Sequence, residues 1–67
     1  MIIARFAEER RLELRKRMNE LADYLAGGGA NSFEEYRSVC GEIRGLALSE
    51  RALLDAAERL EKDALDD

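Results

Sequence analysis

The chain has 67 residues, and among them there is no proline, no histidine and no tryptophan, while Cys40 is the only cysteine. Without histidine, no imidazole is present to activate a serine hydroxyl or the thiol, so we expect no nucleophilic catalysis. One thiol is also too few ligands for a zinc site, and it cannot form an internal disulfide. We therefore expect no enzymatic activity, no cofactor and no bound metal.

Long apolar runs are also missing. The start, MIIARFAEERR, has a short apolar stretch that charged residues interrupt at once. This pattern fits neither a signal peptide nor a membrane-spanning helix, so no membrane partner is expected. With one free thiol and no export signal, the chain is expected in a cytoplasm, or in a particle assembled there.

The residues that are present suit a soluble helical chain, since 46% are hydrophobic and 39% are charged. A chain below about 70–80 residues rarely gains more than about 3–5 kcal/mol from its own core. Small domains usually add disulfides, a metal or a partner, and the first two are excluded here. We therefore expect a partner, either a second copy of the chain or another protein.

The only break in the pattern is GGGANS, residues 27–32. It predicts one domain, residues 1–67, with a first helix over about 2–26 and a second over about 32–65. Gly27 is expected to end the first helix in the left-handed conformation. Ser32 and Glu35 have the spacing of a capping box, in which each side chain binds the other residue's amide. The sequence thus predicts an all-α fold, an antiparallel two-helix hairpin resembling a coiled coil.

Apolar residues recur every three or four positions in both helices, which predicts one seam on each. The seam of the first helix comprises Ala4, Ala7, Leu14, Met18, Leu21 and Leu25. The seam of the second comprises Tyr36, Val39, Ile43, Leu46, Leu53, Ala57, Leu60 and Ala64. Three more residues, Cys40, Ala47 and Leu54, lie beside this second seam and widen it. We expect Cys40 to be a small buried hydrophobic residue rather than a reactive thiol.

Each seam is interrupted at one polar position, Arg11 in the first helix and Glu50 in the second. Folding the chain about residues 29–31 places these two positions opposite each other. We expect an Arg11–Glu50 pair that fixes the register of the hairpin more than it adds stability. The alternative is that both side chains extend outward into solvent.

Two glycines, Gly41 and Gly45, lie inside the second helix, although each costs a helix about 1 kcal/mol relative to alanine. Both fall on the side of the helix that faces away from its seam. Small side chains allow close approach of another helix, so we expect a protein-interaction surface there. Its predicted residues are Gly41, Gly45, Leu48, Ala52 and Ala56. The alternatives are a local kink, or room at Gly45 for a bulky side chain of the first helix.

Charge is unevenly distributed, with six basic and three acidic residues in 1–17 but five basic and twelve acidic residues in 18–67. The basic stretch RRLELRKR, residues 10–17, is the type of helix that can contact phosphates. Glutamates interrupt it and no aromatic platform accompanies it, so we expect a solvated helix face and no nucleic-acid partner. Contact with phosphates or with an acidic protein remains an alternative, as does mimicry of DNA by the acidic second helix.

The stretch SFEEYRSVCGEIRGLALSERALLDAAERLEKD, residues 32–63, resembles short helical proteins of tailed bacteriophages. The matching elements are Phe33, Tyr36, Gly41, Ile43, Gly45 and Leu46, followed by the Asp-rich end. The resemblance covers about half of the chain and implies a viral origin and a non-enzymatic role in a virion or its assembly. The partner would then be the chain itself or a larger phage structural protein. The alternatives are an inhibitor that binds a host enzyme through its acidic surface, and a weak nucleic-acid binder.

Overall fold

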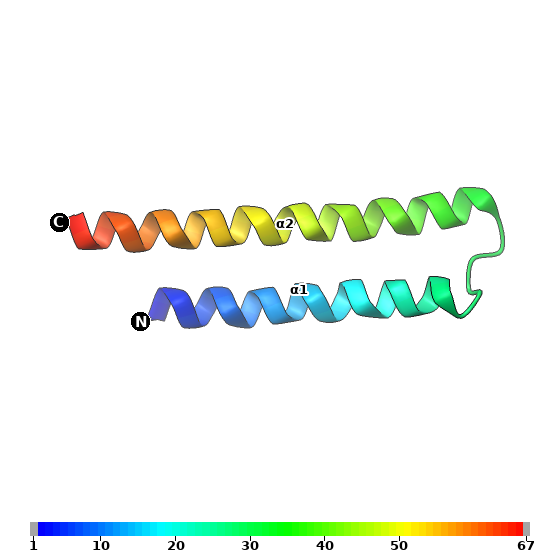
Figure 1. Ribbon diagram of the computed structural model, residues 1–67, viewed down its shortest axis with the longest axis horizontal. Helices are drawn as coiled ribbons and strands as arrows, with labels where there is room; N and C mark the ends of the chain where they lie inside the picture. The colour runs from blue at the N-terminus through cyan, green and yellow to red at the C-terminus, as the bar shows by residue number, and fades with distance from the viewer. Residues whose placement is uncertain (1, 67) are drawn as a thin grey trace.

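The computed structural model describes residues 2–66, which form two helices, α1 (Ile2–Ala26) and α2 (Phe33–Asp66), joined by one loop (Figure 1). The helices run antiparallel and side by side, so both termini lie toward the same end of the molecule. Of the described residues 91% are helical and none belongs to a strand, which confirms an all-α hairpin. The limits of α2 differ by one residue at each end from those expected from the sequence.

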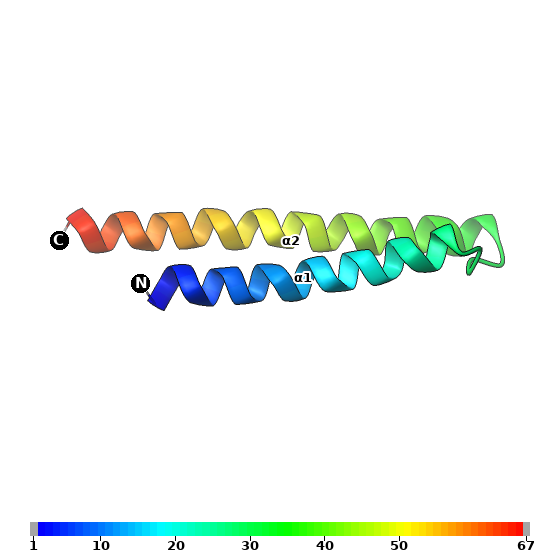
Figure 2. The same ribbon diagram turned by 60° about the horizontal axis from the view of Figure 1, so that its bottom comes forward.

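The hairpin is a rod whose Cα atoms span 53 × 16 × 9 Å, with a radius of gyration of 15.7 Å. A compact domain of this length would have a radius of gyration of about 11 Å. The long dimension matches the length of α2 alone, since 34 residues at about 1.5 Å each give roughly 51 Å. Figure 2 shows that the helices are slightly inclined to each other. Each helix contacts the other along one face.

The chain leaves α1 through a Schellman turn. The amide of Gly28 donates to the carbonyl of Leu25 at 3.1 Å, and the amide of Gly29 donates to the carbonyl of Tyr24 at 2.8 Å. Gly28 has a φ of 80° and is the left-handed residue. The expectation that Gly27 has this conformation is wrong, because its amide still makes a helical bond four residues back. The left-handed position therefore comes one residue later.

The start of α2 has half of the predicted capping box. The hydroxyl of Ser32 accepts a hydrogen bond from the amide of Glu35 at 3.0 Å. The Glu35 carboxylate, however, accepts from the amide of Asn31 at 3.1 Å and from the hydroxyl of Tyr24. The ring of Tyr24 lies against Gly29, where a methyl group would collide with it. Tyr24 thus ties the end of α1 to the start of α2 and takes the place of the expected reciprocal bond.

The core is a single thin seam. Among the described residues, only Ala7, Met18 and Leu21 are apolar and buried. The half-buried apolar residues along the same seam are Ile3, Leu14 and Leu25 on α1, and Val39, Ile43, Leu46, Leu53 and Ala57 on α2. The seam predicted from the sequence therefore holds over the middle of both helices.

The predicted seam fails near the ends of the helices, where Ala4, Tyr36, Leu60 and Ala64 are exposed. Since α2 has 34 residues and α1 has 25, α2 extends about 13 Å beyond its partner. Leu60 and Ala64 lie in this extension and have no α1 residue opposite. Ile3 takes the half-buried place expected for Ala4. Cys40 is half-buried rather than buried, because it borders the seam on one side only.

Replacing Gly28 by alanine should destabilise the hairpin by about 1–2 kcal/mol, because the new residue would have to adopt the left-handed conformation. Urea unfolding at one protein concentration would measure the change. Gly27→Ala is the matched control: Gly27 has no positive φ, and a methyl group there would lie 3.3 Å from the carbonyl oxygen of Asp23, so this variant should lose less stability than Gly28→Ala. Equal stability of the two variants would contradict the turn described above.

Candidate functional site

Glu50 lies in the middle of the seam and is the one buried charged residue among those described, with 9% of its surface exposed. Arg15 binds it through two hydrogen bonds, Nε to Oε2 at 2.7 Å and Nη2 to Oε1 at 2.8 Å. Nη1 of Arg11 lies 3.9 Å from the same Oε2. The structure thus brings the predicted residues Arg11 and Glu50 together, but the main partner of Glu50 is Arg15.

Arg15 was missed because it lies beside the seam, one turn after Arg11. Arg11 itself is held by Glu8, with Nε to Oε2 at 3.0 Å and Nη2 to Oε1 at 2.6 Å. A second arginine four residues after a seam arginine was the signal available in the sequence. The guanidinium of Arg15, and more weakly that of Arg11, holds the pKa of Glu50 below its ordinary value. We call Arg11, Arg15 and Glu50 the ion cluster.

The ion cluster is structural in character. Its carboxylate is bidentate with one guanidinium, and no buried side-chain nitrogen or oxygen in the described residues lacks a hydrogen-bond partner. Both oxygens of the Glu50 carboxylate accept a hydrogen bond from Arg15. This geometry supports the prediction that the cluster sets which residues of α1 lie opposite which residues of α2.

The two edges of the seam differ. On one edge, Arg17 of α1 binds Glu42 of α2 at 3.1 Å, and one heptad further along Tyr24 binds Glu35. We call this edge, with those four residues, the bridged edge. The hydroxyl of Tyr24 lowers the pKa of Glu35, while the Glu35 carboxylate raises the pKa of Tyr24.

The opposite edge is apolar, and in the described structure it is crossed by Arg15. We call it the open edge; its residues are Tyr36, Cys40, Ala47 and Leu54 on α2, and Ala22 and Ala26 on α1. Tyr36 and Leu54 are 47% and 39% exposed. Phe33 extends this surface toward the loop and stacks on Tyr36, with ring centroids 6.3 Å apart.

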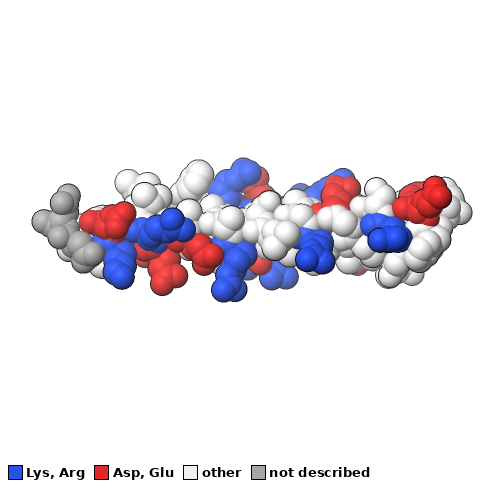
Figure 3. Space-filling view, turned by 90° about the horizontal axis from the view of Figure 1, so that it is seen from above, with Lys and Arg blue, Asp and Glu red and all other residues white. Residues whose placement is uncertain are grey.

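The predicted glycine face, Gly41, Gly45, Leu48, Ala52 and Ala56, lies on the side of α2 away from α1, and all five residues are exposed. A methyl group added at Gly41 or Gly45 would meet no atom within 4 Å. Gly45 therefore does not make room for an α1 side chain. The helix is continuous through both glycines, and Figure 1 shows no sharp bend in it. Figure 3 looks onto this side of α2 and shows uncharged surface between scattered charged side chains.

The basic stretch 10–17 is largely neutralised by glutamates. Arg10 binds Glu13 at 2.8 Å within α1. Arg11 binds Glu8, Arg15 binds Glu50 in the ion cluster, and Arg17 binds Glu42 on the bridged edge. Contacts of this kind fit a solvated helix face better than a row of cations available for phosphates.

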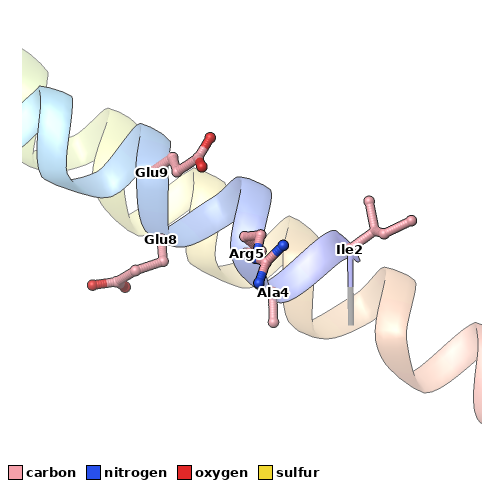
Figure 4. Close-up of a pocket in the computed structure, with 5 residues that line it drawn as sticks. All are labelled: Ile2, Ala4, Arg5, Glu8 and Glu9. Atoms are coloured by element: carbon pink, nitrogen blue, oxygen red, sulfur yellow. The ribbon is translucent and has the colours of Figure 1, made fainter.

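A shallow hollow lies along the first turns of α1 and is lined by Ile2, Ala4, Arg5, Glu8 and Glu9. Figure 4 shows that the side chains of Ile2, Glu8 and Glu9 point away from one another. Glu8 is engaged by Arg11. A ligand site needs polar groups that converge on one point. The polar side chains that line this hollow do not converge.

The described residues contain no group of Cys, Asp or Glu side chains placed to hold a metal ion. Neither α1 nor α2, over residues 2–66, has a segment that is apolar for long enough to cross a membrane. Comparisons with protein-family models, curated proteins and solved structures found no match.

A double-mutant cycle should give a larger coupling between Arg15 and Glu50 than between Arg11 and Glu50, because Arg15 makes the two short bonds. The variants are Arg15→Ala, Arg11→Ala and Glu50→Ala, alone and in pairs, and the measurement is the free energy of unfolding in urea. The exchange Arg15→Glu with Glu50→Arg should be tolerated better than either reversal alone. Absence of coupling in both cycles would contradict the register.

Stability should fall in acid because of Glu50. Arg15 lowers its pKa in the folded chain, so the stabilisation is fully present above the pKa of the unfolded chain, about 4.3. This stabilisation is lost as the pH falls through the lower pKa that Glu50 has in the folded chain. Thermal unfolding between pH 7 and pH 2 should therefore show a falling Tm, and Glu50→Gln should have a smaller slope. An unchanged slope in Glu50→Gln would contradict the role given to Glu50.

Proposed function

We propose that this chain is a non-catalytic structural or assembly accessory that acts through helix–helix contacts with other proteins. The observation that carries the proposal is the amount of apolar surface that the hairpin leaves uncovered. Only three apolar residues are buried among those described, whereas many large ones are exposed. The most exposed are Ile2, Phe6, Phe33, Leu48, Leu60 and Leu65, between 56% and 88%.

The total surface supports the same conclusion. A compact protein of 7.6 kDa exposes about 4300 Å², whereas this chain exposes 5415 Å². The excess of roughly 1100 Å² is comparable with the 800 Å² or so that each partner loses in an interface of standard size. A protein that works alone usually covers such surface with its own chain. A partner would cover it here.

The glycine face is a surface that such a partner fits. Two interior glycines cost α2 about 1 kcal/mol each, and no contact inside the hairpin offsets this cost, since the space beside both is empty. Another helix packed closely on Gly41, Gly45 and Ala52 would offset it through van der Waals contact. Leu48, which is 61% exposed, would be the bulky contact on this face.

The setting that we propose is a bacteriophage particle or its assembly in the host cytoplasm. This part of the proposal depends on the resemblance of residues 32–63 to short helical phage proteins. The partner on the glycine face would be a larger structural protein of the particle. Mass spectrometry of purified virions tests this setting directly. Peptides of this chain should be present in a constant ratio to the major structural proteins, and their absence from virions and assembly intermediates alike would contradict it.

The double variant Gly41→Ala, Gly45→Ala should have two opposite effects. The isolated chain should become more stable, by about 1 kcal/mol per site, because the methyl groups enter empty space. Partner binding should weaken, since overpacking a close helix contact costs about 1–3 kcal/mol. Urea unfolding followed by circular dichroism measures the gain in stability. Incorporation into particles, quantified by mass spectrometry, measures the loss of partner binding.

Leu48→Ala is the control for this experiment. It should reduce incorporation by removing an exposed apolar contact, while helicity changes little because alanine is a good helix former. If the glycine double variant is incorporated at the level of the unmodified chain, the glycine face is not the contact surface.

A further inference from the structure

We infer that a second copy of the chain packs on the open edge, so that two hairpins form a four-helix bundle. The inference deepens the proposed function, on which it rests, by naming one partner and the surface that it covers. The larger particle protein would bind the glycine face, which lies on another side of α2.

The open edge is continuous with the hairpin's own seam. On α2 the apolar stripe is wider than one helix can cover, since Tyr36, Cys40, Ala47 and Leu54 recur at intervals of four and seven residues beside the buried seam. A helix with one apolar seam suits a two-stranded coiled coil, whereas a wider stripe is typical of a helix with two neighbours in a bundle. The α1 helix is one neighbour, and the open edge requires another.

Both edges of the seam have contacts between α1 and α2, two on the bridged edge and the Arg15–Glu50 pair on the open edge. On the bridged edge, Arg17–Glu42 and Tyr24–Glu35 close the groove between the helices, and a helix approaching there would have to break them. On the open edge, the guanidinium of Arg15 is bound to Glu50, in the middle of the seam. Arg51, at the border of this edge, is paired with Asp55 at 3.6 Å along α2. An approaching helix would therefore meet one contact between α1 and α2 on the open edge, the Arg15–Glu50 pair, instead of two.

The shape of the open edge favours a copy of the same chain. Near the loop, the bulky Tyr36 on α2 lies level with the small Ala22 and Ala26 on α1, while Leu54 lies farther along α2, beyond Glu50. The handedness of two antiparallel helices places Tyr36 and these alanines side by side on one surface. A two-fold rotation brings Tyr36 of one copy onto the alanines of the other, and does so twice in the same interface. Two-fold contacts of this kind build four-helix bundles from hairpins.

The area is sufficient for a stable dimer. The chain exposes roughly 1100 Å² more than a compact protein of its mass, as the relation between mass and surface shows. A standard interface removes about 800 Å² from each partner. The uncovered surface of the whole chain is therefore large enough for one interface of standard size, and the open edge is part of that surface.

The test is sedimentation equilibrium of the whole chain and of two single variants. The unmodified chain should be a dimer. Ala47→Glu places a charge in the centre of the open edge, at an exposed position of the hairpin, and should raise the dimer Kd by roughly 100-fold or more. Leu48→Glu is the matched control on the neighbouring residue, since Leu48 belongs to the glycine face, and its dimer Kd should stay within about threefold. Circular dichroism should show that all three chains are helical at the concentrations used for sedimentation.

Cys40 provides a second, independent measurement. It is the only thiol, it is half-buried, and it lies in the open edge. Its alkylation by a maleimide should slow as the concentration of the unmodified chain rises through the dimer range. In Ala47→Glu the rate should stay at the monomer value over the same range.

Three results would overturn the inference. A monomeric unmodified chain at every accessible concentration would exclude the dimer, while the proposed function would stand if the chain is still incorporated into particles. Loss of the dimer in Leu48→Glu, with its retention in Ala47→Glu, would place the second copy on the glycine face. A monomer that is also absent from particles would remove both the inference and the proposed function.

Discussion

The register between α1 and α2 is the constraint on which the rest of the structure depends, and the ion cluster is the contact that we expect to select it. Glu50 is buried and needs a cation, and only a narrow range of registers puts Arg11 and Arg15 within reach of it. A shift of one heptad would leave a carboxylate in an apolar seam without a partner, which is far more costly than a poorly packed leucine. The apolar contacts favour pairing of the helices, and we expect the cluster to select one pairing among several.

The register also determines which surfaces remain uncovered. With Arg11 near Glu50, Ile2 is about level with Arg59, and the last two turns of α2 extend beyond α1. The same alignment brings Arg17 to Glu42 and closes the bridged edge. No such bridge forms between Ala22 or Ala26 and the other side of α2, because alanine has no polar group. The difference between the two edges thus follows from the sequence once the register is set.

Much of this architecture could be predicted from the sequence, because its signals are local or periodic. The break at residues 27–32, the cap at Ser32 and the two seams depend on near neighbours in the chain. Arg15 could not be ranked above Arg11, because its long side chain reaches Glu50 from beside the seam, and heptad counting considers only Cα positions. The left-handed residue was placed at Gly27 instead of Gly28, since three consecutive glycines give no signal that distinguishes them. Exposure at Leu60 depends on the unequal lengths of the helices, which the periodic pattern does not take into account.

The glycine face and the open edge impose different demands on α2. Close packing on Gly41 and Gly45 needs an approaching backbone, because these positions have no side chain to extend toward a partner. The open edge has bulky side chains at Tyr36 and Leu54, which hold a partner helix at the usual interaxial distance of about 8–10 Å. One helix cannot satisfy both, since the two surfaces lie on different sides of α2 and require different separations. The two proposed contacts, one with a second copy and one with a larger protein, would therefore not compete for the same side of α2.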